Sequence, residues 1–296
     1  EFIRNNRVFF GLSAVVILTL SYFLIPTTYN NDVIKTEIKN HILKKYKIDI
    51  KFNEKIRYGL LPKPHYVTKN LSILREKQEI GVAKNFKVFI GINDFFSFNK
   101  LDMKNLVFTK TDFNMKKDDL LFFLELLKTE PNDNKIILKK SNIFFKDDRD
   151  ELLFLNKIKS SKFYYDTFNL ENVFTSKNEI FNVPYKLIIK NDRFNKNIFS
   201  KFNSKKIRLD IENNINYEDE YKKGKMELLF INKNLSLDYQ IKKNSLLFNS
   251  SNKKMINGFV DFKPFFLETN LFYQAISLKN LLNTESFLVD MIKSEI

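Results

Sequence analysis

The sequence predicts a mainly β protein in which an N-terminal transmembrane helix precedes an elongated, curved antiparallel sheet (a β-groove) with a few capping helices. The stretch from Val8 to Ile25 contains no charged residue. Much of the remaining chain alternates apolar and polar residues with a period of two, as strands with one buried and one wet face do. About ten such strands follow one another through short polar turns. This order favours a long sheet over a compact sandwich, although alternating strands also fit an ordinary closed core.

The apolar stretch is long enough to cross a bilayer. At ~1.5 Å per helical residue, Val8 to Ile25 spans about 27 Å, close to the ~30 Å of a hydrocarbon core. Arg4 and Arg7 precede it and the polar residues 30–32 follow it, which places the N-terminus in the cytoplasm. A cleaved signal is the alternative, but the segment after Ile25 offers no small-x-small cleavage site. We therefore predict an anchor over residues 1–29 and a β-rich domain over 30–296.

The first half of the domain alternates between helical and strand patterns. Ile34, Ile38 and Ile42 recur at helical spacing in residues 32–46, with Asn31 or Asp32 available as the N-cap. The period then changes to two, which predicts strands over residues 48–52, 56–60, 67–74 and 83–92. A broad apolar surface predicts a capping helix over residues 117–128, ended by the proline and polar residues of 131–134.

The second half is predicted to be almost entirely β. Strands over 136–145 and 151–158 flank a polar turn at 146–150. Further along, one set of apolar residues alternates with polar neighbours and shares one face of the sheet. A final helix is predicted over 278–296, without a strict sequence repeat anywhere in the chain. The apolar set comprises Ile207, Leu209, Ile211, Met226, Leu228, Phe230, Leu235, Leu237, Tyr239 and Ile241.

Composition excludes several classes of function. The chain has no cysteine, so it has neither disulfides nor thiolate metal sites. The net charge of +15 would suit a nucleic-acid partner, but the lysines are dispersed, and an excess of Lys, Asn, Ile, Phe and Tyr is typical of AT-rich codons. We therefore predict no nucleic-acid partner, and retain a weak attraction to anionic lipid headgroups.

No catalytic, cofactor or metal site is predicted. The sequence lacks GxGxxG, P-loop and GxSxG motifs. The acidic residues 147–151 lack the glycine and distal glutamate of a calcium loop, so we interpret them as a solvated hairpin turn. His41 lies beside an apolar helical surface, where a partly exposed helix histidine is expected, and His65 has no evident partner. The protein is therefore not expected to be an enzyme.

Three stretches resemble the AsmA-like family of bacterial envelope proteins, relatives of TamB and of the chorein-type bridge proteins. The first is the anchor and helix followed by YKIDIKFNEKIRYGLLPKPHYVTKNLSIL. The second is SNIFFKDDRDELLFLNKI, which is similar to a strand–turn–strand unit of that family. The third is GFVDFKPFFLETNLFYQAISLKNLL, which resembles its G-x-(hydrophobic)-x-F-x-P-F strand followed by a helix. Because family members are often longer, the chain is expected to be a piece of a longer protein.

The resemblance implies a bacterial inner-membrane protein whose bulk lies in the periplasm and guides phospholipids towards the outer membrane. Its partners would be phospholipid acyl chains, the inner membrane through Val8 to Ile25, and outer-membrane or periplasmic proteins. The ten apolar residues given above are then the expected lipid-contacting set. The alternative is a membrane-tethered periplasmic scaffold that assists outer-membrane protein assembly.

Overall fold

The computed structural model describes residues 7–93, 95, 101–116, 119, 126–217, 222–231, 233–242, 244–251, 256–262 and 265–271. It divides into two compact units. Unit 1 comprises residues 1–113 and 133–139, and unit 2 comprises residues 114–132 and 140–296. The predicted final helix over 278–296 lies outside the described residues. So does most of the predicted helix over 117–128, of which residues 119 and 126 are described and helical.

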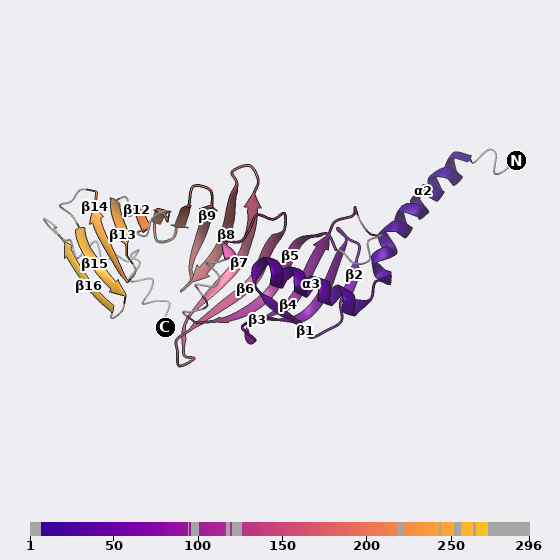
Figure 1. The fold of residues 1–296 in the computed structure, drawn as a ribbon, viewed down its shortest axis with the longest axis horizontal. Helices are drawn as coiled ribbons and strands as arrows, with labels where there is room; N and C mark the ends of the chain where they lie inside the picture. The colour runs from indigo at the N-terminus through magenta and orange to yellow at the C-terminus, as the bar shows by residue number, and fades with distance from the viewer. Residues whose placement is uncertain are drawn as a thin grey trace. The chain divides into compact units, whose positions relative to one another are not determined.

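In the described part of the chain, three helical elements and five strands come first, and Figure 1 shows their arrangement. The elements are α2 (Arg7–Leu24), the short 3-10 helix η1 (Ile25–Thr28), α3 (Asn31–Tyr46), β1 (Asp49–Phe52), β2 (Arg57–Gly59), β3 (His65–Arg75), β4 (Gln78–Ile90) and β5 (Met103–Met115). The four strands predicted between residues 48 and 92 are confirmed as β1 to β4, with bounds that differ by a few residues.

Eleven further strands follow within the described residues. They are β6 (Lys135–Lys146), β7 (Leu152–Asp166), β8 (Glu171–Ile180), β9 (Val183–Asp192), β10 (Asn197–Ser204), β11 (Leu209–Asn216), β12 (Lys222–Phe230), β13 (Lys233–Ile241), β14 (Ser245–Ser250), β15 (Ile256–Phe262) and β16 (Phe265–Leu271). The described strands form one 16-stranded sheet in which β1, β3 and then β4 to β16 are hydrogen-bonded in chain order, while β2 pairs with β3. The predicted long sheet is confirmed, but the expected number of about ten strands was too low.

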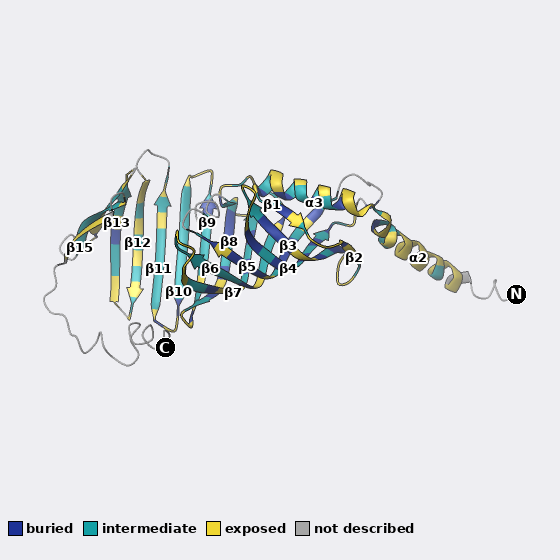
Figure 2. Ribbon diagram, turned by 90° about the horizontal axis from the view of Figure 1, so that it is seen from below, coloured by how far each residue is buried: buried dark blue, intermediate teal, exposed yellow. Residues whose placement is uncertain are grey.

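The apolar helix α2 forms as predicted and continues into η1. Together they provide the stretch Phe9–Thr28, which is long and apolar enough to cross a membrane. Most of its side chains are exposed, as the yellow colour of α2 in Figure 2 shows. The side of the membrane on which the N-terminus lies stays a prediction.

Tyrosine hydroxyls tie the C-terminal end of α2 to the strands of unit 1. The Tyr58 hydroxyl donates to the carbonyl of Phe23 at 2.8 Å, and the Tyr66 hydroxyl donates to the carbonyl of Pro26 at 3.0 Å. In the opposite direction, the Tyr22 hydroxyl donates to the carbonyl of Ile92 at 2.5 Å. The bonds from Tyr58 and Tyr66 satisfy carbonyls at the end of the helical segment, which otherwise lack intrahelical partners. The apolar helix is therefore joined to the sheet by specific contacts.

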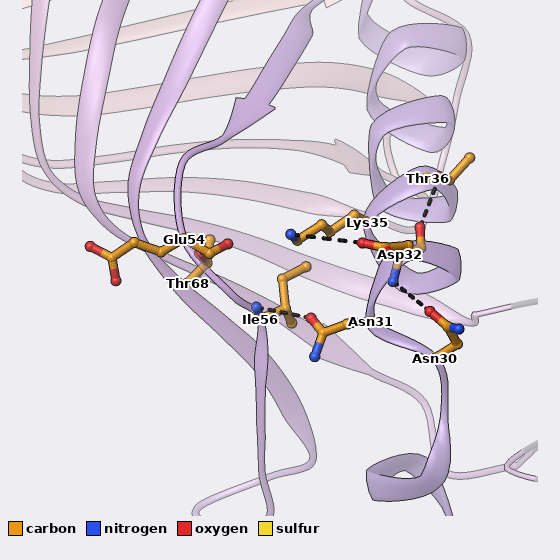
Figure 3. Close-up of polar contacts among 8 residues, drawn as sticks. All are labelled: Asn30, Asn31, Asp32, Lys35, Thr36, Glu54, Ile56 and Thr68. Carbon is orange, nitrogen blue, oxygen red and sulfur yellow. Dashed lines mark hydrogen bonds and ion pairs between the residues drawn. The ribbon is translucent and has the colours of Figure 1, made fainter.

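The N-cap of α3 is Asn30, one residue earlier than expected. Its side chain accepts a hydrogen bond from the backbone N–H of Asp32 at 2.8 Å (Figure 3). The Asn31 side chain instead accepts from the backbone N–H of Ile56 at 3.1 Å, so it joins the helix to the strand region. The predicted apolar surface is confirmed, because Ile34, Ile38 and Ile42 are all buried.

His41 on α3 is held in its neutral form. The amide nitrogen of Asn134 lies within hydrogen-bond distance of His41 Nε2, an arrangement that suits an unprotonated ring nitrogen. Burial, and next the positive charge of Lys45, lower the pKa of His41 from 6.5 to about 4. The expected helix position is confirmed, but the side chain makes a specific polar contact with a residue far along the chain.

We expect unit 1 to lose stability as the pH falls from about 6.5 to about 4. In this window the unfolded chain binds a proton at His41 that the folded chain excludes, so folding free energy is lost as pH decreases. The loss should be about 1–2 kcal/mol after allowing for solvent screening of a half-buried group. Urea unfolding of the detergent-solubilised chain at pH 7 and pH 4.5, followed by circular dichroism, measures it. His41→Gln should be less sensitive to this change, and parallel losses in both proteins would contradict the assignment.

Candidate functional site

Nine of the ten predicted lipid-contacting residues lie on one face of β11, β12 and β13. Cross-strand register places Leu209 opposite Phe230, Ile211 opposite Leu228, Leu228 opposite Leu235, and Met226 opposite Leu237. Residues that are directly opposite in a ladder point to the same side of the sheet. Tyr239 and Ile241 follow Leu237 at intervals of two and therefore share this side.

Ile207 is the exception, and its predicted position in a strand was wrong. It lies in the turn at residues 205–208 that joins β10 to β11, where it is buried. The next residue, Arg208, has a positive φ of 51°, a backbone conformation that ends regular strand geometry. The alternation of Ile207 with Leu209 therefore crosses a turn instead of following one strand.

The apolar face extends beyond the predicted strands into β9 and β10. Leu187 lies opposite Phe202, and Phe202 lies opposite Ile211. Five residues thus form a continuous row across five strands, which we call the apolar stripe: Leu187, Phe202, Ile211, Leu228 and Leu235. At a strand spacing of ~4.8 Å the stripe is about 19 Å long. Each of its side chains is only partly buried, so apolar surface remains accessible along the row.

The opposite face of the same strands is polar and carries ion pairs. Lys201 pairs with Glu212, its direct cross-strand partner between β10 and β11. On β12, Lys225 lies 2.9 Å from Glu227. Exposed ion pairs contribute at most about 1 kcal/mol each, so their main effect is to keep this face hydrated. The polar face therefore suits contact with water, and the apolar face suits contact with apolar groups.

Tyrosine–asparagine pairs recur on the apolar side, each joining strands that are separated by one other strand. The Tyr185 hydroxyl on β9 donates to Asn156 Oδ1 on β7 at 3.1 Å. The Tyr239 hydroxyl on β13 donates to Asn213 Oδ1 on β11 at 2.6 Å. Tyr217, directly after β11, donates to Asn191 Oδ1 on β9 at 3.0 Å. Burial raises the pKa of Tyr185 and of Tyr239, so these two hydroxyls remain protonated donors.

A glycine makes room for the pair of Tyr239 and Asn213. Gly224 on β12 lies opposite Tyr239 on β13. A Cβ at position 224 would lie 2.3 Å from the Tyr239 ring, closer than real Cβ contacts. The ring therefore lies across β12 to reach Asn213, and an alanine at 224 would displace it. This arrangement matches the packing of an aromatic ring over a glycine in sheets.

Two buried asparagines at one end of the apolar face bind the segment 127–129. Asn172 donates to the carbonyls of Leu127 and Thr129, at 3.0 and 2.8 Å. Asn191 also donates to the carbonyl of Leu127, at 2.8 Å. Leu127 itself is buried. Residues 127–129 are therefore bound at this end of the face, whereas most of the helix predicted to cap the sheet lies outside the described residues.

A shallow hollow of about 690 Å³ lies beside the same strands. Amide and charged side chains line most of it, including Asn214, Asn249 and Lys225, and Tyr239 is the one predicted lipid-contacting residue among its lining. The apolar stripe does not line this hollow.

The acidic residues 147–151 and His65, which were considered from the sequence as site candidates, make structural contacts. Asp147 accepts hydrogen bonds from the backbone N–H groups of Arg149 and Glu151, at 2.8 and 2.9 Å. The acidic residues 147–151 thus form the hairpin turn between β6 and β7, as predicted. His65 is buried, and its ring packs against Phe89 with a centroid separation of 5.4 Å.

Neither a protein-family model nor a curated protein sequence matches this chain.

We expect replacement of each paired tyrosine by phenylalanine to destabilise unit 2. Tyr185→Phe, Tyr217→Phe and Tyr239→Phe each remove one hydroxyl and leave an asparagine oxygen without its donor, which should cost about 0.5–1.5 kcal/mol. Urea unfolding measures the loss. Tyr165→Phe is the matched control, since its hydroxyl takes part in none of the three pairs. Equal effects at all four positions would show that the pairs contribute no specific stability.

Proposed function

We propose that this protein is anchored in the bacterial inner membrane and guides phospholipids along the apolar face of unit 2 towards the outer membrane. The proposal includes a groove-like, concave form of the sheet, in which acyl chains lie against the predicted lipid-contacting residues. The resemblance to AsmA-like proteins supports this function, and so do the features of the two faces.

The apolar stripe is the observation that carries the proposal. An acyl chain is an unbranched apolar rod, and a row of aliphatic and aromatic side chains offers a path along which it can slide without meeting a specific polar partner. Each CH₂ group removed from water contributes ~0.8 kcal/mol. Partial burial of Phe202, Ile211 and Leu228 leaves surface for such contacts. The hydrated opposite face allows the same strands to stand in an aqueous compartment.

A pair of neighbouring residues on β12 provides the test. Leu228 belongs to the apolar stripe, whereas Leu229 lies on the polar face and is 44% exposed. We expect Leu228→Glu to reduce the phospholipid that copurifies with the chain several-fold, because a buried carboxylate cannot be solvated beside an acyl chain. Leu229→Glu should retain it. Native mass spectrometry and lipid extraction, compared on the full chain in the same detergent, measure the loading.

The outcomes of this experiment separate the proposal from its alternative. Far-UV circular dichroism first shows that both variants keep the strand content of the parent chain. Equal lipid loading in the two variants, or a folded parent chain without lipid beyond that bound by α2, would contradict lipid guidance. Stable crosslinks to outer-membrane proteins that persist in Leu228→Glu would favour the membrane-tethered scaffold.

The proposed topology has its own test, because the chain contains no cysteine. A single introduced cysteine is therefore the only thiol. In cells with a permeabilised outer membrane, a membrane-impermeant maleimide should label Asp148→Cys, which lies in the exposed turn between β6 and β7. It should label Asn5→Cys, on the other side of the anchor, only after the inner membrane is lysed. The reverse pattern would overturn the proposed orientation.

A further inference from the structure

Two hairpin turns of unit 2 share both sequence and geometry. The turn between β7 and β8 contains Asp166-Thr167-Phe168-Asn169, and the turn between β9 and β10 contains Asp192-Arg193-Phe194-Asn195. Both therefore follow the pattern D-x-F-N. In each, the residue after the asparagine has a positive φ, 57° at Leu170 and 49° at Lys196. The pattern is short, but both copies occupy equivalent turns of the sheet, so we treat them as a repeated structural feature.

The hydrogen bonds of the two turns are the same. Asp166 Oδ1 accepts from the backbone N–H groups of Phe168 and Asn169 at 3.0 and 3.3 Å, and the Asn169 side chain donates to Asp166 Oδ2 at 2.9 Å. In the second turn, Asp192 Oδ1 accepts from Phe194 and Asn195 at 3.0 and 2.9 Å, and the Asn195 side chain donates to Asp192 Oδ2 at 2.6 Å. Such aspartate-centred turns fix the backbone locally.

Each rigid turn presents a phenylalanine almost completely to solvent. Phe168 is 91% exposed and Phe194 is 89% exposed. A single exposed apolar side chain is ordinary, but two identical turns that each expose the same large ring are a repeated feature. Burying these rings in unit 2 would add stability, and the turns hold them away from it. Their exposure therefore points to a surface outside the chain.

The two rings lie at the same end of their strands. Asn172 at the start of β8 pairs with Asn191 near the end of β9, so the turns before β8 and after β9 are neighbours. At two strand spacings they are about 10 Å apart. Polar or basic residues near the rings include Thr167, Arg193 and Lys196, and Leu170 beside Phe168 is a further exposed apolar side chain. Both aspartates direct their oxygens into the turns.

We propose that these two turns of unit 2 insert Phe168 and Phe194 into the headgroup region of a phospholipid bilayer. Aromatic rings favour that region because the ring meets the acyl boundary while neighbouring polar groups remain with the headgroups. Two separate, convex turn tips fit a continuous fluid surface better than the shaped pockets of a protein partner. Arg193 and Lys196 suit a bilayer that contains anionic lipid. The apolar helix α2, long enough to cross a membrane, gives the chain access to a bilayer.

Tryptophan fluorescence tests this proposal site by site, because the chain contains no tryptophan. Phe168→Trp and Phe194→Trp each place one reporter at a turn tip. Lys205→Trp is the control, in the exposed turn between β10 and β11 at the other end of these strands. The full chain is held in nanodiscs of phosphatidylcholine and phosphatidylglycerol. Acyl-chain-brominated phosphatidylcholine is supplied either in the nanodisc or in added vesicles, so that contact with the chain's own bilayer and with a second bilayer are both detected.

Brominated lipid in at least one of the two arms should quench the emission of tryptophans 168 and 194 several-fold and leave tryptophan 205 nearly unchanged. Absence of quenching in both arms would overturn the proposal. A blue shift without bromine quenching would indicate contact with protein and would also overturn it. This test does not depend on lipid guidance by the apolar stripe. Leu228→Glu can lose lipid loading while the tryptophans at both turn tips remain quenched. Equally, lipid loading can persist in a chain whose turn tips are not quenched.

Discussion

Register between consecutive strands is the constraint on which unit 2 depends. Side chains alternate between the faces of a strand, so a slip by one residue would move every apolar side chain of that strand to the polar side. The apolar stripe crosses five strands, and one slip anywhere within it would interrupt the row. Tight turns hold the register from the strand ends, as the hydrogen bonds of Asp166 and Asp192 show. The turns therefore help to keep the apolar side chains of neighbouring strands on the same face.

The tyrosine–asparagine pairs fix the same register from the middle of the sheet. Leucine and isoleucine pack almost equally well against several neighbours, so an apolar row alone specifies alignment weakly. A half-buried hydroxyl needs one partner at one place, because leaving the pair unmade costs desolvation without a compensating bond. Tyr185, Tyr217 and Tyr239 each reach over one intervening strand. Each pair thus aligns three strands at once.

Strong local periodicity explains which parts of this architecture the sequence predicts. The buried face of α3 and the strands of unit 1 were predicted because Ile34, Ile38 and Ile42 and the period-two segments show regular spacing. The strands β8 to β10 were not singled out, since polar residues such as Ser176 and Ser200 interrupt the alternation on the apolar side. Phe202 was missed for this reason. Ile207 was misplaced because alternation continues through a turn that the sequence does not mark with glycine or proline. The tyrosine–asparagine pairs depend on register, which one sequence does not reveal. The repeated D-x-F-N is present in the sequence, but so short a pattern does not by itself indicate a shared turn geometry.

The core of unit 1 and the apolar stripe of unit 2 differ in how far their apolar side chains are buried. This difference bears on the proposed function. In unit 1, side chains such as Ile38, Leu71 and Leu106 are completely buried, so its core is complete without a ligand. Along the apolar stripe of unit 2, the side chains keep accessible surface, and each Å² of it forgoes about 25 cal/mol of stabilisation. Any apolar molecule that covers this surface in the folded state alone raises the stability of unit 2 by linkage. Unit 2 also has buried apolar side chains, such as Val173 and Val183, and around the stripe the hydrogen-bonded pairs and turns help to hold the strands in place. A face built in this way stays folded while its apolar side chains remain accessible, which the proposed guidance of lipid would require and a permanent core would not.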